Sequence, residues 1–228
     1  QKVAWDAYYD PLIKEFKAAN LEGKALAHWK FNRYIKDYLR SIQSVDDGVG
    51  QLLDYLDENG LSENTIVVYT SDQGFYLGEH GWFDKRFMYE ESFRMPLLIR
   101  YPKEIRPGAK LDQLVQNLDF APTFLDYAGV AIPDDMQGES FRKVLSGDSE
   151  RFRDHAYYTY YEYPAEHSVM RHYGIRTDRY KLIHFYHDLD YWELYDLDED
   201  PSEMNNVYGK PGYAIIQAAL TKKLSEVR

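Results

Sequence analysis

The 228-residue sequence has no cysteine, which excludes disulfide bonds, thiolate metal sites and a cysteine nucleophile within this chain. Long apolar runs are also absent and the mean hydropathy is −0.61, so we expect no transmembrane helix. Basic charge is scarce. The 27 basic residues against 38 acidic ones give a net charge of −11, which argues against nucleic acid or an anionic membrane as the main partner.

The sequence does contain enough apolar material for a folded core. Hydrophobic residues make up 44% and aromatic residues 16%, too much for a disordered chain. The length fits one or two domains. The first ten residues contain an early acidic residue and no apolar core, so we expect no signal peptide. Because the chain starts with Gln1, we expect it to begin inside a longer polypeptide.

The first part of the chain has the pattern of a layered α/β domain. Between residues 30 and 59, apolar residues recur at steps of three and four, which predicts one long helix. The runs 65–70 and 96–100 predict strands, the first covered on both faces as in a parallel or mixed sheet. Residues 119–129 predict another helix, with Asp119 as its N-cap. This order of elements favours an α/β fold.

Beyond residue 148, short aromatic runs separated by turn residues replace this pattern. Such runs predict a small antiparallel sheet, with strands near residues 157–161, 173–176, 180–185 and 192–195. Apolar residues at helical spacing predict a closing helix over residues 214–227. We therefore place a boundary between residues 1–148, an α/β part, and residues 149–228, a small antiparallel α+β part.

Polar side chains gather where the strand at 65–70 should end, which is where open α/β sheets bind their ligands. Asp72 and Gln73 offer a carboxylate and an amide oxygen, donors that suit Ca²⁺ or Mg²⁺ rather than Zn²⁺. His80 adds a group able to donate a proton, and Lys85 adds a fixed positive charge. The pattern fits a metal-assisted site for an anionic ester, and it also fits a solvated surface loop.

Segments 65–86 and 88–96 closely resemble the sulfatase family of the alkaline-phosphatase-like superfamily. The resemblance continues through several ordered motifs, namely residues 38–47, 119–123, 193–197 and 200–203, with Asn206. It is strongest to sulfatases acting on sulfated sugars, including glycosaminoglycans. It implies the C-terminal part of an alkaline-phosphatase-like mixed-sheet core plus a small antiparallel α+β subdomain. It also implies hydrolysis of sulfate esters or N-sulfates of carbohydrates.

The resemblance implies a role for individual residues. Asp72 and Gln73 match the second pair of metal ligands, which implies Ca²⁺ in preference to Mg²⁺. Lys85 matches the lysine that binds a sulfate oxygen and stabilises charge that develops in the transition state. His80 matches a glycine–glutamate–histidine–glycine loop near the site, where it either donates a proton or only shapes the loop.

The family's C-terminal subdomain helps to wall the substrate cleft, and Arg171 and His172 belong to this part of the chain. They are therefore candidate substrate-binding residues, with a plain surface turn as the alternative. The implied partner is a sulfated carbohydrate, with neither nucleic acid nor membrane. The implied location is outside the cytoplasm, either exported (periplasmic or extracellular) or lysosomal.

The remaining parts of a sulfatase site are not matched in this sequence. The family carries its nucleophile in the N-terminal half, as a Cys or Ser in a C/S-x-P-x-R motif that is converted to formylglycine, together with the first metal-binding aspartates. No serine here has that context, and Asp46 and Asp47 fall inside the predicted long helix. The chain therefore resembles a C-terminal half and should have no turnover alone. We expect it to pair with the missing half or to self-associate through an exposed sheet edge.

Two alternatives stay open. A phosphoric or phosphonic ester hydrolase on the same scaffold usually has more His and Asp ligands in this region, whereas Gln73 with Lys85 favours sulfate and a single metal. The second alternative is a non-catalytic carbohydrate-binding fragment. A C/S-x-P-x-R motif upstream in the gene would eliminate it.

Overall fold

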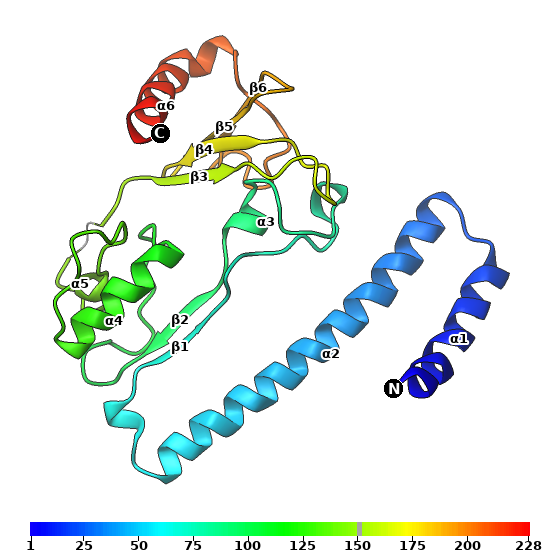
Figure 1. Ribbon diagram of the computed structural model, residues 1–228, viewed down its shortest axis with the longest axis horizontal. Helices are drawn as coiled ribbons and strands as arrows, with labels where there is room; N and C mark the ends of the chain where they lie inside the picture. Colours follow the sequence, from blue (N-terminus) through cyan, green and yellow to red (C-terminus); the bar gives the residue numbers. More distant parts are fainter. Residues whose placement is uncertain (150–151) are drawn as a thin grey trace. The chain divides into compact units, whose positions relative to one another are not determined.

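The computed structural model describes residues 1–149 and 152–228, which fall into two compact units, Gln1–Asn59 and Gly60–Arg228. The first unit consists of helices α1 (Lys2–Ala19) and α2 (Gly23–Glu58) (Figure 1). The predicted long helix is confirmed, although it begins at Gly23 instead of near residue 30. Helix α1 was not predicted, and Pro11 lies inside it. Neither helix has a buried residue among those described.

The second unit begins with a two-stranded antiparallel sheet. After a short 3-10 turn (Ser62–Asn64), β1 (Val67–Thr70) pairs with β2 (Leu97–Arg100), so that Val68 lies opposite Ile99. Both predicted strands are confirmed. The expected cover on both faces is not seen among the described residues, because Tyr69 is 39% exposed and Leu98 is 65% exposed.

Helix α4 (Phe120–Ala128) confirms the helix predicted after residue 119, but Asp119 does not cap it with its side chain. The Asp119 carboxylate instead accepts hydrogen bonds from the backbone N–H groups of Gln116 and Glu139. It also forms an ion pair with Arg153. Asp119 thus occupies the predicted N-cap position of α4, but its carboxylate is used by these other partners instead of capping the helix. A 3-10 turn (Asn117–Asp119) precedes α4, and the short helix α5 (Arg142–Leu145) packs below it.

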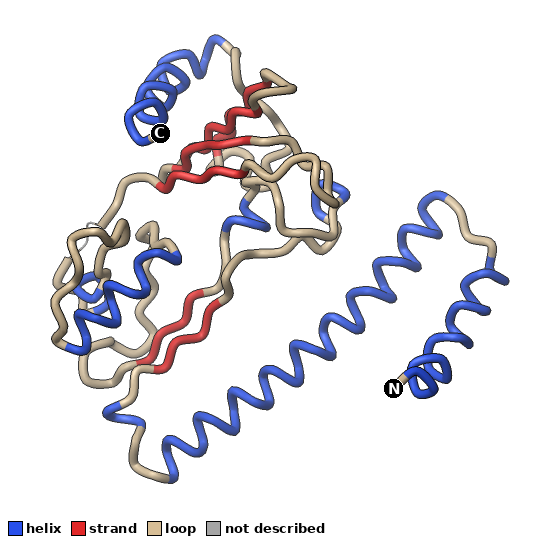
Figure 2. The backbone as a smooth tube through the Cα atoms, in the orientation of Figure 1, coloured by secondary structure: helices blue, strands red, loops and turns tan. Residues whose placement is uncertain are grey.

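The C-terminal part contains the predicted antiparallel sheet. Its strands lie in the order β3 (Ala156–Tyr160), β4 (His172–Arg176), β5 (Tyr180–Phe185) and β6 (Tyr191–Asp196), each antiparallel to its neighbour (Figures 1 and 2). The predicted closing helix is α6 (Ala214–Val227), after a 3-10 turn (Pro211–Tyr213). The boundary predicted between residues 148 and 149 adjoins residues 150–151, which lie outside the described residues, and it stays a prediction.

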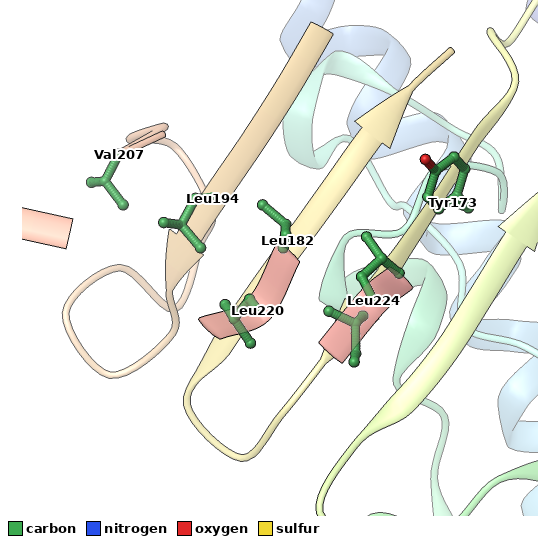
Figure 3. Packing of buried hydrophobic residues seen from close by; sticks show 7 residues of the cluster. Tyr173, Leu182, Leu194, Val207, Leu220 and Leu224 are labelled. Carbon is green, nitrogen blue, oxygen red and sulfur yellow. The ribbon is translucent and has the colours of Figure 1, made fainter. Parts of the chain in front are cut away.

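The alternation of side chains along β5 gives this sheet two apolar faces. Leu182 faces α6 and packs with Leu194, Leu220 and Leu224 (Figure 3). The neighbouring residue, Ile183, faces the opposite side and packs against Met88, close to helix α3 (Glu90–Phe93). The loop that carries the candidate site is thus docked on the sheet face opposite α6.

In the part of the chain that the structure describes, every helix is either too short or too polar to cross a lipid bilayer.

Candidate active site

Asp72 and Gln73 lie in a tight turn directly after β1. The Ser71 hydroxyl donates a hydrogen bond to the Gln73 carbonyl oxygen at 2.8 Å and also lies 3.3 Å from Asp72 Oδ1. The Asn117 side-chain amide donates to the Asp72 carbonyl oxygen at 2.6 Å. The backbone of the turn is therefore held from two sides, while the Asp72 side chain stays exposed. This leaves its carboxylate accessible to a ligand.

Ser92, which is buried in α3, joins the two ends of the candidate loop. Its carbonyl oxygen accepts a hydrogen bond from the Gly74 N–H at 2.8 Å, and its hydroxyl donates to the Lys85 carbonyl oxygen at 2.7 Å. Within the loop, the Tyr76 N–H also donates a hydrogen bond to the Asp84 carbonyl oxygen at 2.7 Å. The backbone after Gln73 and the backbone at Lys85 therefore meet on one buried residue.

This close approach explains why residue 74 is glycine. A Cβ atom on Gly74 would lie 2.0 Å from the Glu91 carbonyl oxygen and 3.0 Å from that of Arg94. Both contacts are with backbone atoms, which cannot move aside as a flexible side chain can. The glycine thus allows the Asp72–Gln73 turn to pack directly against α3.

His80 lies in the 3-10 turn Glu79–Gly81, with a left-handed backbone conformation (φ 54°). Its ring stacks on Tyr89, with 4.5 Å between ring centroids, and its Nε2 atom lies 3.4 Å from Glu91 Oε2. The side chain is only 12% exposed. The imidazole is therefore held in one orientation by a ring beneath it and a carboxylate beside it.

Lys85 is exposed, and within residues 1–149 and 152–228 no side chain pairs with its ammonium group. Its neighbours are held in place. The Asp84 carboxylate pairs with Arg86 at 2.5 Å and lies 3.4 Å from His167 Nδ1. A free ammonium group between restrained neighbours is suited to binding an anionic ligand.

Arg171 is engaged by the loop that follows β3. Its guanidinium donates hydrogen bonds to the carbonyl oxygens of Tyr161 (3.0 Å) and Tyr163 (3.2 Å). Arg171 is partly exposed, so its remaining N–H groups stay available to a ligand. The observed contacts show that Arg171 holds the backbone of this loop in place.

His172 is completely buried, with 0% of its surface exposed. Its ring stacks on Phe87, Tyr158 and Tyr160 and is tilted against Phe185, at centroid distances of 5.1 to 5.8 Å. Burial lowers the pKa of His172 to about 4, although its contact with the Met170 carbonyl oxygen opposes this shift. The geometry favours packing over sugar contact for this residue.

Several residues that the sequence patterns did not single out as functional support the loop from below. Tyr89 donates a hydrogen bond to Glu193 Oε2 at 2.9 Å, and burial raises the pKa of Glu193. Lys181, also fully buried, lies 2.8 Å from Glu90 and 2.7 Å from Glu203. The one signal for this cluster was a lysine inside the apolar run of β5, since a buried charge requires a partner.

Asn206, part of the C-terminal motif, has a structural role. Its side-chain oxygen accepts hydrogen bonds from the backbone N–H groups of Leu194 and Tyr208, and its amide donates to the Trp192 carbonyl oxygen. It thereby fixes the returning chain to β6.

The donor set fits part of a metal site. Asp72 and Gln73 are adjacent oxygen donors of the kind that Ca²⁺ and Mg²⁺ prefer. Among the described residues, no group of three or more His, Asp or Glu side chains is placed to hold a metal ion. Since Ca²⁺ takes six to eight oxygen ligands, further ligands would have to come from elsewhere.

Two family models match the chain. The C-terminal model of N-sulphoglucosamine sulphohydrolase covers residues 78–228, and the sulfatase model covers residues 5–130. Together they include the whole candidate loop and the C-terminal sheet.

Individual relatives agree with these matches. An N-acetylglucosamine-6-O-sulfatase of Bacteroides thetaiotaomicron is 56% identical over 98% of this chain and 41% of that protein. A solved structure of a complex with the substrate D-glucosamine-2-N,6-O-disulfate has a TM-score of 0.93 at 56% identity, and covers 98% of this chain and 46% of that one. The phosphonate monoester hydrolase of Agrobacterium radiobacter has a TM-score of 0.72 at 26% identity, and covers 82% of this chain and 39% of that one. The chain thus spans less than half the length of these relatives.

Proposed function

The chain belongs to the sulfatase family, and from that premise we propose that it supplies one side of a site that hydrolyses sulfate esters of carbohydrates. The relative that is 56% identical is described as an N-acetylglucosamine-6-O-sulfatase, so the 6-O-sulfate of a glucosamine residue is the proposed substrate group. The proposal covers the complete protein, because formylglycine, the family's nucleophile, belongs to a part that this chain does not match.

The meeting of Gly74 and Lys85 on Ser92 carries this proposal. Two segments that the family assigns to one site are joined here by hydrogen bonds to a single buried residue. An arrangement in which the Asp72–Gln73 turn and Lys85 were far apart could not bind the same anion.

In the proposed site, the side-chain oxygens of Asp72 and Gln73 hold a divalent cation. The family resemblance favours Ca²⁺ over Mg²⁺. When bound, the cation would offset negative charge on the sulfate oxygens. Ser71 and Asn117 hold the backbone of the turn by hydrogen bonds to its carbonyl oxygens, which keeps the Asp72 and Gln73 side chains on one turn.

Lys85 is proposed to bind a sulfate oxygen through its free ammonium group and to stabilise the charge that develops in the transition state. His80 is proposed to face the same site, with Glu91 and Tyr89 fixing the orientation of its ring. Arg171 remains a proposed sugar contact, and it would act at the edge of the loop that it organises. We assign His172 to packing.

Sulfate is favoured over phosphate or phosphonate because identity to the sulfatase is 56%, against 26% to the phosphonate hydrolase. The same comparison disfavours a non-catalytic fragment. On family membership alone we propose a location outside the cytoplasm, exported or lysosomal.

The test is kinetic. The complete polypeptide is purified and assayed on N-acetylglucosamine 6-sulfate and on the matched 6-phosphate. We expect sulfate release with kcat/KM at least about 100-fold above that for phosphate release, and a loss of about 100-fold or more in Lys85→Ala. Preference for the phosphate ester, or full activity in Lys85→Ala, would contradict the proposal.

A further inference from the structure

The structure contains a buried cluster of charges beneath the candidate loop, separate from the groups that face a ligand. Lys181 on β5 is fully buried, on the sheet face opposite α6. Its Nζ atom lies 2.8 Å from Glu90 Oε1 and 2.7 Å from Glu203 Oε1. Arg176 adds a second cation, 3.3 Å from Glu90 Oε2. Two carboxylates thus face two cations, and the cluster is electrically balanced.

Glu203 connects this cluster to the backbone of α3. Its second oxygen, Oε2, accepts a hydrogen bond from the Glu90 N–H at 2.6 Å. Glu203 holds this position with a left-handed backbone (φ 51°) that turns its side chain inward. One carboxylate therefore spans Lys181 on the sheet and the first residue of α3.

The electrostatics of the two carboxylates differ for a physical reason. Burial would raise the pKa of Glu90, but Lys181 and Arg176 hold it below its ordinary value. Burial raises the pKa of Glu203, whose side chain is completely buried and has one cation, Lys181, to oppose the shift. Glu203 is thus the weaker member of the cluster, and its geometry depends on keeping both of its contacts.

The cluster leads to the site through two residues of α3. Glu90 is fixed by Glu203 and Lys181, and Ser92 follows it in the same turn of helix. Ser92 in turn holds the Gly74 N–H and the Lys85 carbonyl oxygen. A shift of α3 would therefore move both ends of the loop.

We propose that Lys181, Glu90 and Glu203 are positioning residues, which place the backbone of the Asp72–Gln73 turn and of Lys85 for anion binding. The C-terminal sheet thereby influences the geometry of the site indirectly, through its contacts with α3. The proposal rests on the proposed function for its effect on catalysis, but not for its effect on the loop.

The variant that tests it is Glu203→Gln in the complete polypeptide. Glutamine has one acceptor oxygen, so it can keep the contact with Lys181 or with the Glu90 N–H, but not both. The matched control is Glu104→Gln, which removes a carboxylate paired with Arg142 at 2.6 Å, outside the cluster and the loop.

Amide hydrogen exchange reads the position of the loop without using activity. In Glu203→Gln, the amides of residues 74–93 should exchange about tenfold faster or more than in the parent, while those of α6 exchange at the parent's rate. The lost contact lies beneath the loop, so only the loop and α3 should open more often. Glu104→Gln should leave residues 74–93 as in the parent. Unchanged exchange over 74–93, or a uniform rise that includes α6, would overturn the proposal.

A double-mutant cycle connects the cluster to the chemistry. Glu203→Gln should lower kcat/KM about tenfold or more in the parent, and by a clearly smaller factor in a Lys85→Ala background, because the part of the loss that acts through Lys85 is then already gone. Losses that simply multiply would overturn positioning through Lys85. If Glu203→Gln exchanges faster over residues 74–93 while Lys85→Ala stays fully active, the role of the cluster in positioning the loop is supported. The proposed function of Lys85 is then overturned.

Discussion

His172 shows at the scale of one residue how burial sets the chemistry of a side chain. Its pKa falls from 6.5 to about 4 because the ring is buried among aromatic residues. Between these pH values the unfolded chain binds a proton here and the folded chain does not. The contribution to stability is therefore complete above pH 6.5 and declines as the pH falls towards 4, by up to about 3 kcal/mol.

Urea unfolding at pH 7 and pH 4.5 checks this prediction, with His172→Phe as the comparison. The free energy of unfolding of the parent should fall more between the two pH values than that of His172→Phe, because phenylalanine has no group to protonate. Equal pH dependence in the two proteins would show that His172 is not a buried neutral imidazole.

Gly74 gives a second prediction at this scale. Gly74→Ala should lower the free energy of unfolding by about 1–3 kcal/mol, because its Cβ would overlap the Glu91 carbonyl oxygen. Gly212→Ala is the control, since a Cβ at Gly212 has no neighbour within 4 Å. Denaturant titration of both variants is the measurement, and equal stability would refute the close approach at Gly74.

Among the secondary-structure elements, the start of α4 depends on Asp119, whose carboxylate has two possible roles there. As an N-cap it would contribute about 0.5–2 kcal/mol. As a fully buried carboxylate paired with Arg153 and with two backbone N–H groups, its loss should cost about 3–5 kcal/mol. We expect the larger loss for Asp119→Ala in denaturant unfolding, and a loss below about 2 kcal/mol would restore the capping role.

The elements that the sequence predicted are those with a strong local signal. Apolar spacing identified α2 and α6, and short aromatic runs bounded by turns identified β3 to β6. The contacts that the sequence could not provide join distant residues. Nothing local shows that Lys181 reaches Glu203, or that Ser92 holds both Gly74 and Lys85.

The same distinction applies to the candidate site. Asp72, Gln73, His80 and Lys85 were predicted from motif and position, and hydrogen bonds to Ser92 join the two ends of the loop that carries them. The burial of His172 was not visible in the sequence, because His172 directly precedes the strand predicted near residues 173–176, where a surface turn was the alternative. Its environment depends on Phe87, which approaches from a loop far away in the sequence.

At the scale of the whole molecule, the chain spans 41% of a relative with which it shares 56% identity. Large apolar side chains on α2 are exposed, namely Phe31, Tyr34, Leu39, Ile42, Val45, Leu52 and Tyr55. We therefore expect these 228 residues, expressed alone, to bind a hydrophobic dye or to self-associate. Size-exclusion chromatography with dye fluorescence is the measurement, and a compact monomer without a dye signal would contradict this expectation.

In the proposed site, the turn after β1 binds a cation and Lys85 binds the anion next to it. A crystal structure of the complete polypeptide with Ca²⁺ and N-acetylglucosamine 6-sulfate is the decisive measurement. We expect Ca²⁺ about 2.3–2.6 Å from oxygens of Asp72 and Gln73, and a sulfate oxygen about 2.7–3.2 Å from Lys85 Nζ. A cation bound away from Asp72 and Gln73, or a sulfate group out of reach of Lys85, would contradict it.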